Sequence, residues 1–142
     1  MTRACVISAA VGLWMLMLGG CSATHVIKGK VIQGNLSFVA VVDQGDERLK
    51  SAGIADVDIS ARADVGKVAG YLFAQGETDA KGDFSMKFKD QSLFLKPVEI
   101  SASKIGFQPA TGSLSLPPGD RRILIILAPG AGGKPAAPSG TR

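Results

Sequence analysis

The feature that most constrains the fold of this chain is an alternation of apolar and polar side chains, repeated in short segments. The clearest segment is Phe84, Ser85, Met86, Lys87, Phe88 and Lys89. Successive side chains of a β-strand point to opposite faces, so this pattern predicts a strand with one buried and one solvated face. No segment after residue 21 shows a convincing helical period. The alternation therefore favours an all-β fold.

Seven further segments, some alternating and some continuously apolar, are expected to be strands. They are residues 26–33, 36–42, 54–62, 71–75, 97–103, 114–116 and 123–127. Such regular spacing, at about 8–12 residues, is typical of β-sandwiches, and we expect a single sandwich over residues 26–128. Residues 36–42 are either a second strand or a continuation of the first past a bulge. Residues 123–127 are apolar on both faces, which predicts a central strand covered on both sides or an interface.

A turn motif, Thr78-Asp79-Ala80-Lys81-Gly82-Asp83-Phe84, precedes the clearest strand. Gly82 can adopt a positive φ without steric cost, and the Asp79 carboxylate can accept hydrogen bonds from the turn backbone. Phe84 then begins the strand and is expected to fill the core. Thr78, Asp79, Gly82 and Phe84 are therefore predicted to form a structural turn.

Five short patterns follow one another along the chain: Gly29-x-Val31, Val57-x-Ile59, the motif of residues 78–84, Val98-x-Ile100 with Gly106-Phe107, and Ile123-x-Ile125-x-Leu127. Taken in this order, they resemble the carboxypeptidase regulatory-like domain. The resemblance implies a seven-stranded Greek-key sandwich of the transthyretin-like (prealbumin-like) type. It also implies a mostly non-catalytic role, as an accessory, interaction or stabilising module. Residues 33–53 are longer and more apolar than the family's usual opening, which leaves the register of the first strands open.

The N-terminus has the features of a secretion signal. Arg3 supplies a positive charge, and residues 4–18 form an uncharged, largely apolar run. That run is shorter than the about 20 apolar residues of a transmembrane helix and is typical of a signal peptide. It ends in Leu18-Gly19-Gly20-Cys21, which resembles the lipobox of bacterial lipoproteins.

The lipobox resemblance implies cleavage between Gly20 and Cys21 and attachment of acyl chains such as palmitate to the Cys21 sulfur. Two or three acyl chains anchor a protein stably, whereas one chain anchors it marginally. Ser22 after the cysteine implies the outer membrane of the bacterial envelope, by resemblance to enterobacterial sorting. The alternative is an ordinary secreted protein with a coincidental cysteine at the cleavage site. We therefore expect the protein to be anchored to the membrane through the acyl chains on Cys21.

Four regions are expected along the chain: a lipoprotein signal peptide (1–20), a lipidated tether (21–25), the sandwich (26–128) and a disordered Gly/Pro/Ala tail (129–142). The tail has too little apolar bulk to fold. Cys5 lies in the signal and Cys21 in the tether. We therefore expect neither a disulfide nor a cysteine metal site in the sandwich.

The charges of the chain are scattered along the sequence. Sixteen Lys and Arg residues stand against twelve Asp and Glu residues, which gives a formal net charge of +4. Contacts with nucleic acids and polybasic contacts with membranes use blocks of like charge, and no such block occurs here. No nucleic-acid partner is therefore expected.

The residues that could carry chemistry do not form a recognisable catalytic set. Hydroxyisourate hydrolases of the transthyretin-like fold use paired histidines, an arginine and a C-terminal Tyr-Arg-Gly-Ser, whereas this chain has one histidine, His25, and ends in Ser-Gly-Thr-Arg. The three carboxylates within residues 43–47 lack the spacing of a calcium loop and are expected to be solvated. Residues 130–134 lack the spacing of a phosphate loop. We expect no enzyme activity, no cofactor and no metal site.

Two functions are consistent with these features. The first is a non-enzymatic, membrane-anchored lipoprotein whose sandwich is a protein-interaction or envelope-structural module, with an unidentified envelope protein as its partner. The alternative is an accessory lipoprotein that binds a peptide or carbohydrate for a transporter or hydrolase. A long exposed sheet edge would favour the first function. A concave pocket lined by Tyr71 or Phe73 would favour the second.

Overall fold

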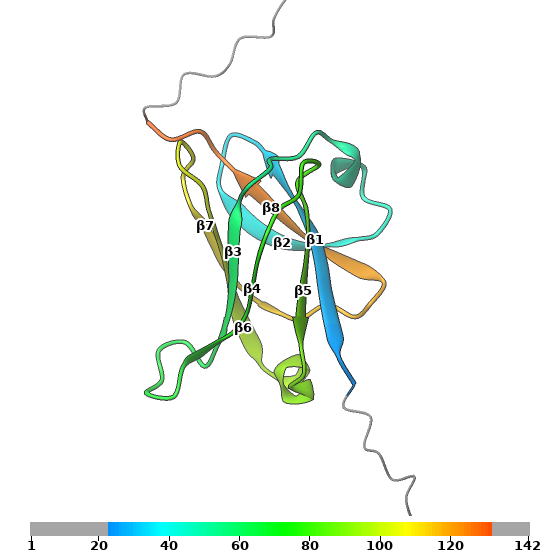
Figure 1. Cartoon of the computed structure of the whole chain (residues 1–142), viewed down its shortest axis with the longest axis vertical. Coiled ribbons are helices and arrows are strands. Elements are labelled where there is room, and N and C mark those ends of the chain that lie inside the picture. The colour runs from blue at the N-terminus through cyan, green and yellow to red at the C-terminus, as the bar shows by residue number, and fades with distance from the viewer. Residues whose placement is uncertain (1–22, 132–142) are drawn as a thin grey trace, which may run out of the picture.

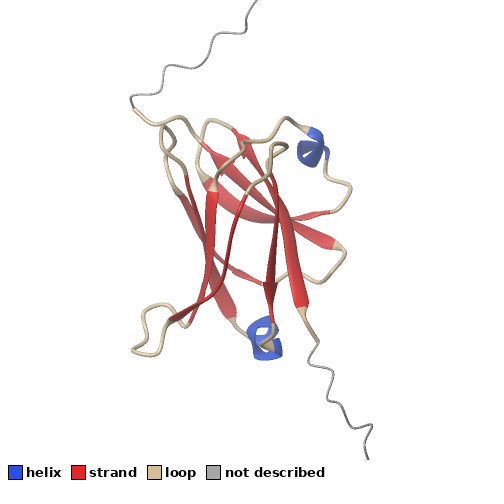
Figure 2. Ribbon diagram, in the orientation of Figure 1, coloured by secondary structure: helices blue, strands red, loops and turns tan. Residues whose placement is uncertain are grey.

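The computed structural model describes residues 23–131, which form two packed β-sheets with connecting loops and two short 3-10 helices (Figures 1 and 2). The strands are β1 (His25–Gln33), β2 (Phe38–Asp43), β3 (Asp58–Ala63), β4 (Tyr71–Glu77), β5 (Asp83–Phe88), β6 (Pro97–Ser103), β7 (Ala110–Ser115) and β8 (Arg121–Leu127). The 3-10 helices are η1 (Glu47–Lys50) and η2 (Gln91–Leu95). No helix in this part of the chain is long and apolar enough to cross a membrane.

Sheet A has the strand order β2-β8-β1-β5, and sheet B has the order β4-β3-β6-β7. Neighbouring strands are antiparallel except β1 and β8, which run parallel with Gly29 opposite Ile123. The prediction of an all-β sandwich is confirmed. The described residues contain eight strands rather than the seven that the family resemblance implies. Each of the eight predicted segments contains one of these strands or part of one.

The largest differences from the expected segments are at the starts of β3 and β7. β3 begins at Asp58 rather than at Ile54, because Asp56 has a φ of 55° that interrupts the extended backbone. β7 begins well before the expected segment 114–116, because its first four residues carry no large apolar side chain that would mark the pattern. Residues 36–42 contain a separate strand, β2, which pairs with β8 and not with β1.

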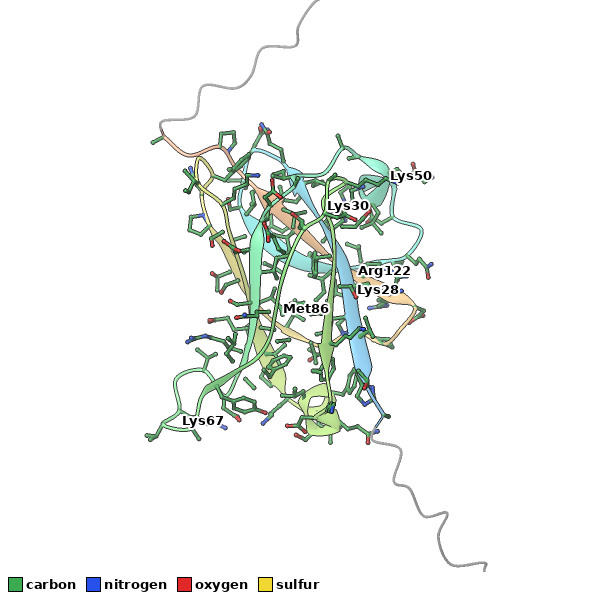
Figure 3. The ribbon with its side chains drawn as sticks, in the orientation of Figure 1. Lys28, Lys30, Lys50, Lys67, Met86 and Arg122 are labelled. Carbon is green, nitrogen blue, oxygen red and sulfur yellow. The ribbon has the colours of Figure 1, made fainter. Side chains whose placement is uncertain are left out.

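The main core lies between the two sheets and follows the predicted alternation. Its alternating members are Ile27 and Val31 of β1, Ile59, Ala61 and Ala63 of β3, Phe84, Met86 and Phe88 of β5, Val98, Ile100 and Ala102 of β6, and Ile123, Ile125 and Leu127 of β8. Figure 3 shows Met86 between the sheets. Burying one such large side chain stabilises a fold by about 1.5–3 kcal/mol. Inward-facing side chains from five of the strands therefore supply most of this core.

A second, smaller apolar cluster covers part of the outer face of sheet A. It consists of Ile32, Val42, Leu124 and Ile126, with Leu49 of η1 packed against it. β8 is therefore buried on both faces. Of the two alternatives for its continuous apolar run, a covered central strand or an interface, the structure has the covered central strand. Asp46 caps η1 by accepting a hydrogen bond from the Arg48 N–H at 2.9 Å, and this cap helps to keep Leu49 over the sheet.

The loops gather at the two ends of the sandwich (Figure 1). The end that we call the N-terminal end contains the start of β1, the β3–β4 loop (64–70) and η2. The opposite end contains the β1–β2 loop (34–37), the β4–β5 turn (78–82) and the β6–β7 loop (104–109). The described chain enters the sandwich at the first end and leaves it at the second.

Candidate functional site

The β4–β5 turn has the geometry expected from its sequence. Asp79 Oδ1 accepts hydrogen bonds from the N–H groups of Lys81 at 2.9 Å and Asp83 at 3.0 Å. Gly82 has a φ of +79°, a conformation that favours glycine. The Gly82 carbonyl accepts a hydrogen bond from the Val31 N–H at 2.8 Å, which joins the turn to β1.

Thr78 connects this turn with the segment that precedes β3. Its side chain is only 4% exposed. Oγ1 accepts a hydrogen bond from the Val57 N–H at 2.9 Å and donates one to the Ile54 carbonyl at 2.7 Å. A Cβ on Gly82 would stand 2.5 Å from Gly53 Cα, so the two backbones meet where glycine is required. Because the Thr78 hydroxyl is used by backbone partners, the arrangement is structural.

Several predictions concern residues outside 23–131. They are the signal peptide (1–20), cleavage after Gly20, lipidation of Cys21 and most of the tail (129–142). The structure leaves them as proposals. Of the tether, His25 already belongs to β1. Pro129 forms an isolated bridge with Phe107, so ordered pairing extends one residue past the expected boundary at 128.

His25 packs among aromatic rings at the N-terminal end. Its ring centroid lies 5.4 Å from that of Phe88 and 5.0 Å from that of Phe94, the latter edge-on. Phe73 meets Phe88 edge-on at 5.6 Å. Such offset and edge-to-face contacts are the preferred packing of aromatic side chains. Phe73 therefore belongs to the border of the core, where its ring supports packing rather than a ligand face.

Tyr71 lies at the surface of the N-terminal end, held by charged neighbours. Its hydroxyl donates a hydrogen bond to Asp90 Oδ2 at 3.0 Å, and the Lys96 ammonium lies 6.0 Å from its ring centroid. Burial and the hydrogen bond to the Asp90 carboxylate raise the pKa of Tyr71 above its ordinary value. Lys96 also pairs with Asp64 at 2.8 Å. These contacts join β4, η2 and the β3–β4 loop and occupy the polar end of the ring.

The carboxylates within residues 43–47 are each paired with a cation. Asp43 pairs with Arg121 at 3.4 Å, Asp46 with Arg48 at 2.8 Å, and Glu47 with Lys50 at 3.0 Å. Hydrogen bonds from Arg48 lower the pKa of Asp46 to about 2. Within residues 23–131 no group of three or more His, Cys, Asp or Glu side chains is arranged to hold a metal ion.

A groove of about 570 Å³ lies on the outer face of sheet A. Three cationic residues line it, Lys28, Lys30 and Arg122. Three acidic residues also line it, Glu77, Asp79 and Asp83. Lys28 and Arg122 lie next to each other on β1 and β8 (Figure 3). The alternating pattern of β1 predicts that Lys28 and Lys30 share one outer face, but no pattern in the sequence predicts that Arg122 lies beside them. Its position depends on the parallel pairing of two strands that are far apart in the sequence.

The edge strands on the two sides of the sandwich differ in charge. β4 and β5 lie on one side and carry Glu77, Asp83 and Lys87. β2 and β7 lie on the other side. β7 contains neither charge nor proline, and the one charge on β2 is its last residue, Asp43. Natural edge strands are usually protected by charges, proline or bulges, so this second side is unprotected in sequence apart from Asp43.

β7 is the more exposed strand of this unprotected side. Thr111, Ser113 and Ser115 are exposed along it, and β6 is its one hydrogen-bonded neighbour among the described strands. β2 lies close behind, since a Cβ on Gly112 would stand 2.9 Å from Val39 Cβ. No described strand hydrogen-bonds with the backbone edge of β7 that faces away from β6. The alternating pattern of the sequence does not predict this edge, because the order of the strands in the sheet decides which of them are edge strands.

Comparisons with known proteins add little to this geometry. No family model matches the sequence, and no curated protein matches it. A similar solved structure is that of a 9R-lipoxygenase from Cyanothece PCC8801, with a TM-score of 0.38 and 13% sequence identity over 63% of this chain. This chain spans 13% of the length of that lipoxygenase chain. A similarity of this size carries neither a fold family nor an activity over to this protein.

Proposed function

We propose that this protein is a non-enzymatic lipoprotein of the bacterial envelope, whose sandwich binds a partner protein along the edge of β7. The observation that carries the proposal is the unprotected edge, which has six residues, no charge and no proline. The uncharged part of β2 lies beside it on the same side of the sandwich. An edge of this kind is a template for strand addition.

Strand addition would use both the backbone and the alternating side chains of β7. Main-chain hydrogen bonds from a partner strand would supply affinity, and contacts with alternate side chains would supply specificity. Thr111 and Ser113 offer small hydroxyl groups on the exposed face, which crowd an incoming strand little. Leu114 is half-buried at the margin of the core. The resulting surface accepts an extended segment without displacing a charge.

The membrane part of the proposal is supported by the sequence around Cys21. The charged N-terminus, the short apolar run and the Leu-Gly-Gly-Cys motif resemble a lipoprotein signal. The sandwich begins at His25, four positions after that cysteine. A lipid at Cys21 would therefore hold the sandwich close to the bilayer, and Ser22 supports placement in the outer membrane.

The proposal includes membership of the carboxypeptidase regulatory-like domains, with a Greek-key, transthyretin-like topology. Two features support it. The turn of residues 78–84, whose sequence resembles the family motif, has the hydrogen bonds expected from Asp79 and the positive φ expected of Gly82, and the strands form two packed four-stranded sheets. The described residues contain eight strands, one more than the resemblance to the family implies.

Site-directed photo-cross-linking in intact cells tests the β7 edge. A photoreactive amino acid at Ser113 is expected to give a discrete cross-linked product with an envelope protein. The same amino acid at Ser60, on the outer face of the central strand β3, serves as the matched control and is expected to give none. Ser113→Lys should remove the product formed by a photoreactive group at Thr111, because a lysine on an edge opposes pairing. Equal cross-linking from both serines would contradict the edge assignment.

Metabolic labelling tests the anchor separately. Labelled palmitate is expected on the wild-type protein and not on Cys21→Ser, which should also leave the membrane fraction and keep its signal peptide. An unlabelled wild-type protein would overturn the anchor while leaving the β7 edge untouched.

The groove on sheet A supports a second candidate function, the binding of a small ligand for a transporter or hydrolase. Its lining offers Lys28, Lys30 and Arg122 together with three acids, which suits a peptide better than a neutral sugar. The one aromatic residue that lines it, Phe84, is buried. Titration calorimetry with a short peptide mixture is expected to show binding that Lys30→Glu abolishes. Peptide binding that survives this change would exclude the groove as the binding site.

A further inference from the structure

We infer that the N-terminal end of the sandwich docks directly on the bilayer, with Val68 of the β3–β4 loop and Leu95 of η2 entering the lipid interface. The inference rests on the proposed lipid anchor at Cys21 and adds a second contact with the same membrane. The surface that it contacts is an anionic phospholipid membrane, as indicated by the exposed side chains, the charges and the short sequence between Cys21 and β1.

Apolar side chains reach far into solvent at this end. Val68 is fully exposed, Leu95 is 89% exposed and Val65 is 52% exposed. They belong to the β3–β4 loop and η2, which lie at the same end as the start of β1 (Figure 1). Peripheral proteins bury such side chains at the boundary between headgroups and acyl chains, and binding strength grows with the apolar area buried.

The two protruding segments are held in place rather than left loose. The Lys96 ammonium, just after η2, bonds Asp64 Oδ2 at 2.8 Å and so ties η2 to the β3–β4 loop. Asp90 caps η2 by accepting a hydrogen bond from the Ser92 N–H at 2.9 Å, and it also accepts the Tyr71 hydroxyl. Because these contacts form within the folded domain, presenting Val68 and Leu95 together costs little further ordering.

The charges at this end complement an anionic surface. Lys67 lies at the tip of the β3–β4 loop (Figure 3); its side chain is 75% exposed, and its ammonium lies 3.4 Å from Asp64 Oδ1. Lys89 is exposed and makes no salt bridge with any residue of 23–131. The nearby carboxylates of Asp64 and Asp90 are engaged in the internal contacts described above. Basic side chains beside an apolar tip are attracted to anionic lipids, and Tyr71 has the amphipathic ring that favours the interface.

The covalent chain places this end near the proposed anchor. Cys21 stands four residues before His25, and an extended chain spans at most about 3.6 Å per residue, so the sulfur-bearing residue lies within about 14 Å of the start of β1. The opposite end also exposes apolar side chains, Leu36 and Ile105. It lies at the far end of the strands, away from the start of β1 (Figure 1). The short tether therefore selects the N-terminal end.

Tryptophan fluorescence of the purified lipoprotein tests the inference. The one tryptophan of the chain, Trp14, lies in the signal region, so the mature protein offers a background without tryptophan. Val68→Trp and Leu95→Trp place the probe at the N-terminal end. Ile105→Trp is the matched control, because Ile105 is equally exposed at the opposite end. Each variant is reconstituted in vesicles of phosphatidylethanolamine and phosphatidylglycerol, with and without brominated acyl chains.

Blue-shifted emission and bromine quenching are expected for Val68→Trp and Leu95→Trp, with no change for Ile105→Trp. Replacing Lys67 by Glu in the Val68→Trp protein should reduce the quenching. Mass spectrometry of the same samples reports the acyl chains on Cys21. Acylated protein with equal quenching at both ends, or with none, would overturn the docking while the anchor stands. A mature chain without acyl groups would overturn the anchor and, with it, the docking.

Discussion

The ring of Phe84 in β5 lies against the backbone of Gly29, its cross-strand partner in β1. A Cβ on Gly29 would stand 2.4 Å from the ring carbon Cζ of Phe84 and 2.2 Å from the carbonyl oxygen of Ile123 in β8. Gly29 therefore meets an aromatic ring and a neighbouring backbone at the centre of sheet A. The absence of a side chain at this position lets the three strands pack as closely as they do.

Gly29→Ala is expected to destabilise the fold by about 3 kcal/mol, because overpacking costs about 1–3 kcal/mol and here a backbone carbonyl stands in the way. Urea unfolding of the purified domain measures the loss. Gly45→Ala is the matched control, since a Cβ at Gly45 would meet nothing within 4 Å. A Gly29→Ala protein as stable as Gly45→Ala would show that β1 and β8 are farther apart than described.

Phe84→Ala is expected to cost about 3–5 kcal/mol, the usual loss for a large aromatic side chain removed from a core. Phe84 is only 5% exposed and belongs to the main core. The free energy of unfolding, obtained from urea titration with the slope compared between variants, gives the value. A loss below about 1 kcal/mol would mean that the ring is solvated.

The positions of the strands could be predicted because burial repeats every second residue, as in Phe84, Met86 and Phe88. The pairing of the strands could not. β1 and β8 are parallel neighbours although Gly29 and Ile123 are far apart in the sequence, and no local pattern records such a contact. The start of β3 was also missed, because the positive φ of Asp56 interrupts a segment that alternates without a break.

The candidate sites likewise divide into those that the local sequence predicts and those that depend on contacts between distant segments. The turn of Asp79 and Gly82 could be predicted because its hydrogen bonds join residues close in sequence. The β7 edge, the groove at Lys28 and Arg122, and the exposed N-terminal end depend on which elements become neighbours. The lysines at that end, such as Lys67 and Lys89, form no block in the sequence, and the fold brings their segments to one end.

Thr78→Val is expected to destabilise the protein through two backbone groups. It removes the hydroxyl that accepts from the Val57 N–H and donates to the Ile54 carbonyl. A buried polar group without a partner costs about 1–3 kcal/mol. Thr78→Ser keeps both hydrogen bonds and should lose only about 1 kcal/mol for one methyl group. Thermal and urea unfolding of the pair measure the difference, and equal losses for the two variants would contradict the role of the hydroxyl.

Acid is expected to destabilise the fold in part through Asp46. Its pKa of about 2 in the folded protein lies below the value of about 3.9 for an unfolded chain. A lowered pKa contributes stability that is present above about pH 4 and is lost as the pH falls through about 2. Asp46→Asn should therefore flatten the stability curve over this window. The change is partial, because hydrogen bonds also lower the pKa of Asp64 and of Asp90.

Asp120→Asn is the control for this titration, because Asp120 makes no salt bridge with another residue of 23–131. Unfolding is measured by urea titration at a series of pH values for the wild type and both variants. The Asp46→Asn side chain retains an amide oxygen that can cap η1, so this variant should stay folded near neutral pH. An unchanged slope in Asp46→Asn would show that the ion pair of Asp46 with Arg48 contributes nothing to acid stability.

Leu49 in η1 is expected to protect the outer face of sheet A from solvent. The side chain packs on the cluster that contains Leu124 and Ile126, which would otherwise be uncovered on a strand that is apolar on both faces. Leu49→Asp should lower the free energy of unfolding by about 1–2 kcal/mol, part of the full value for burying a leucine. It should also increase binding of a hydrophobic dye to the folded protein. Leu36→Asp, at a position 73% exposed, should change neither measurement. If Leu49→Asp behaved like Leu36→Asp, η1 would not be the cover of β8, and the apolar run of that strand would have to be explained by an interface with another molecule.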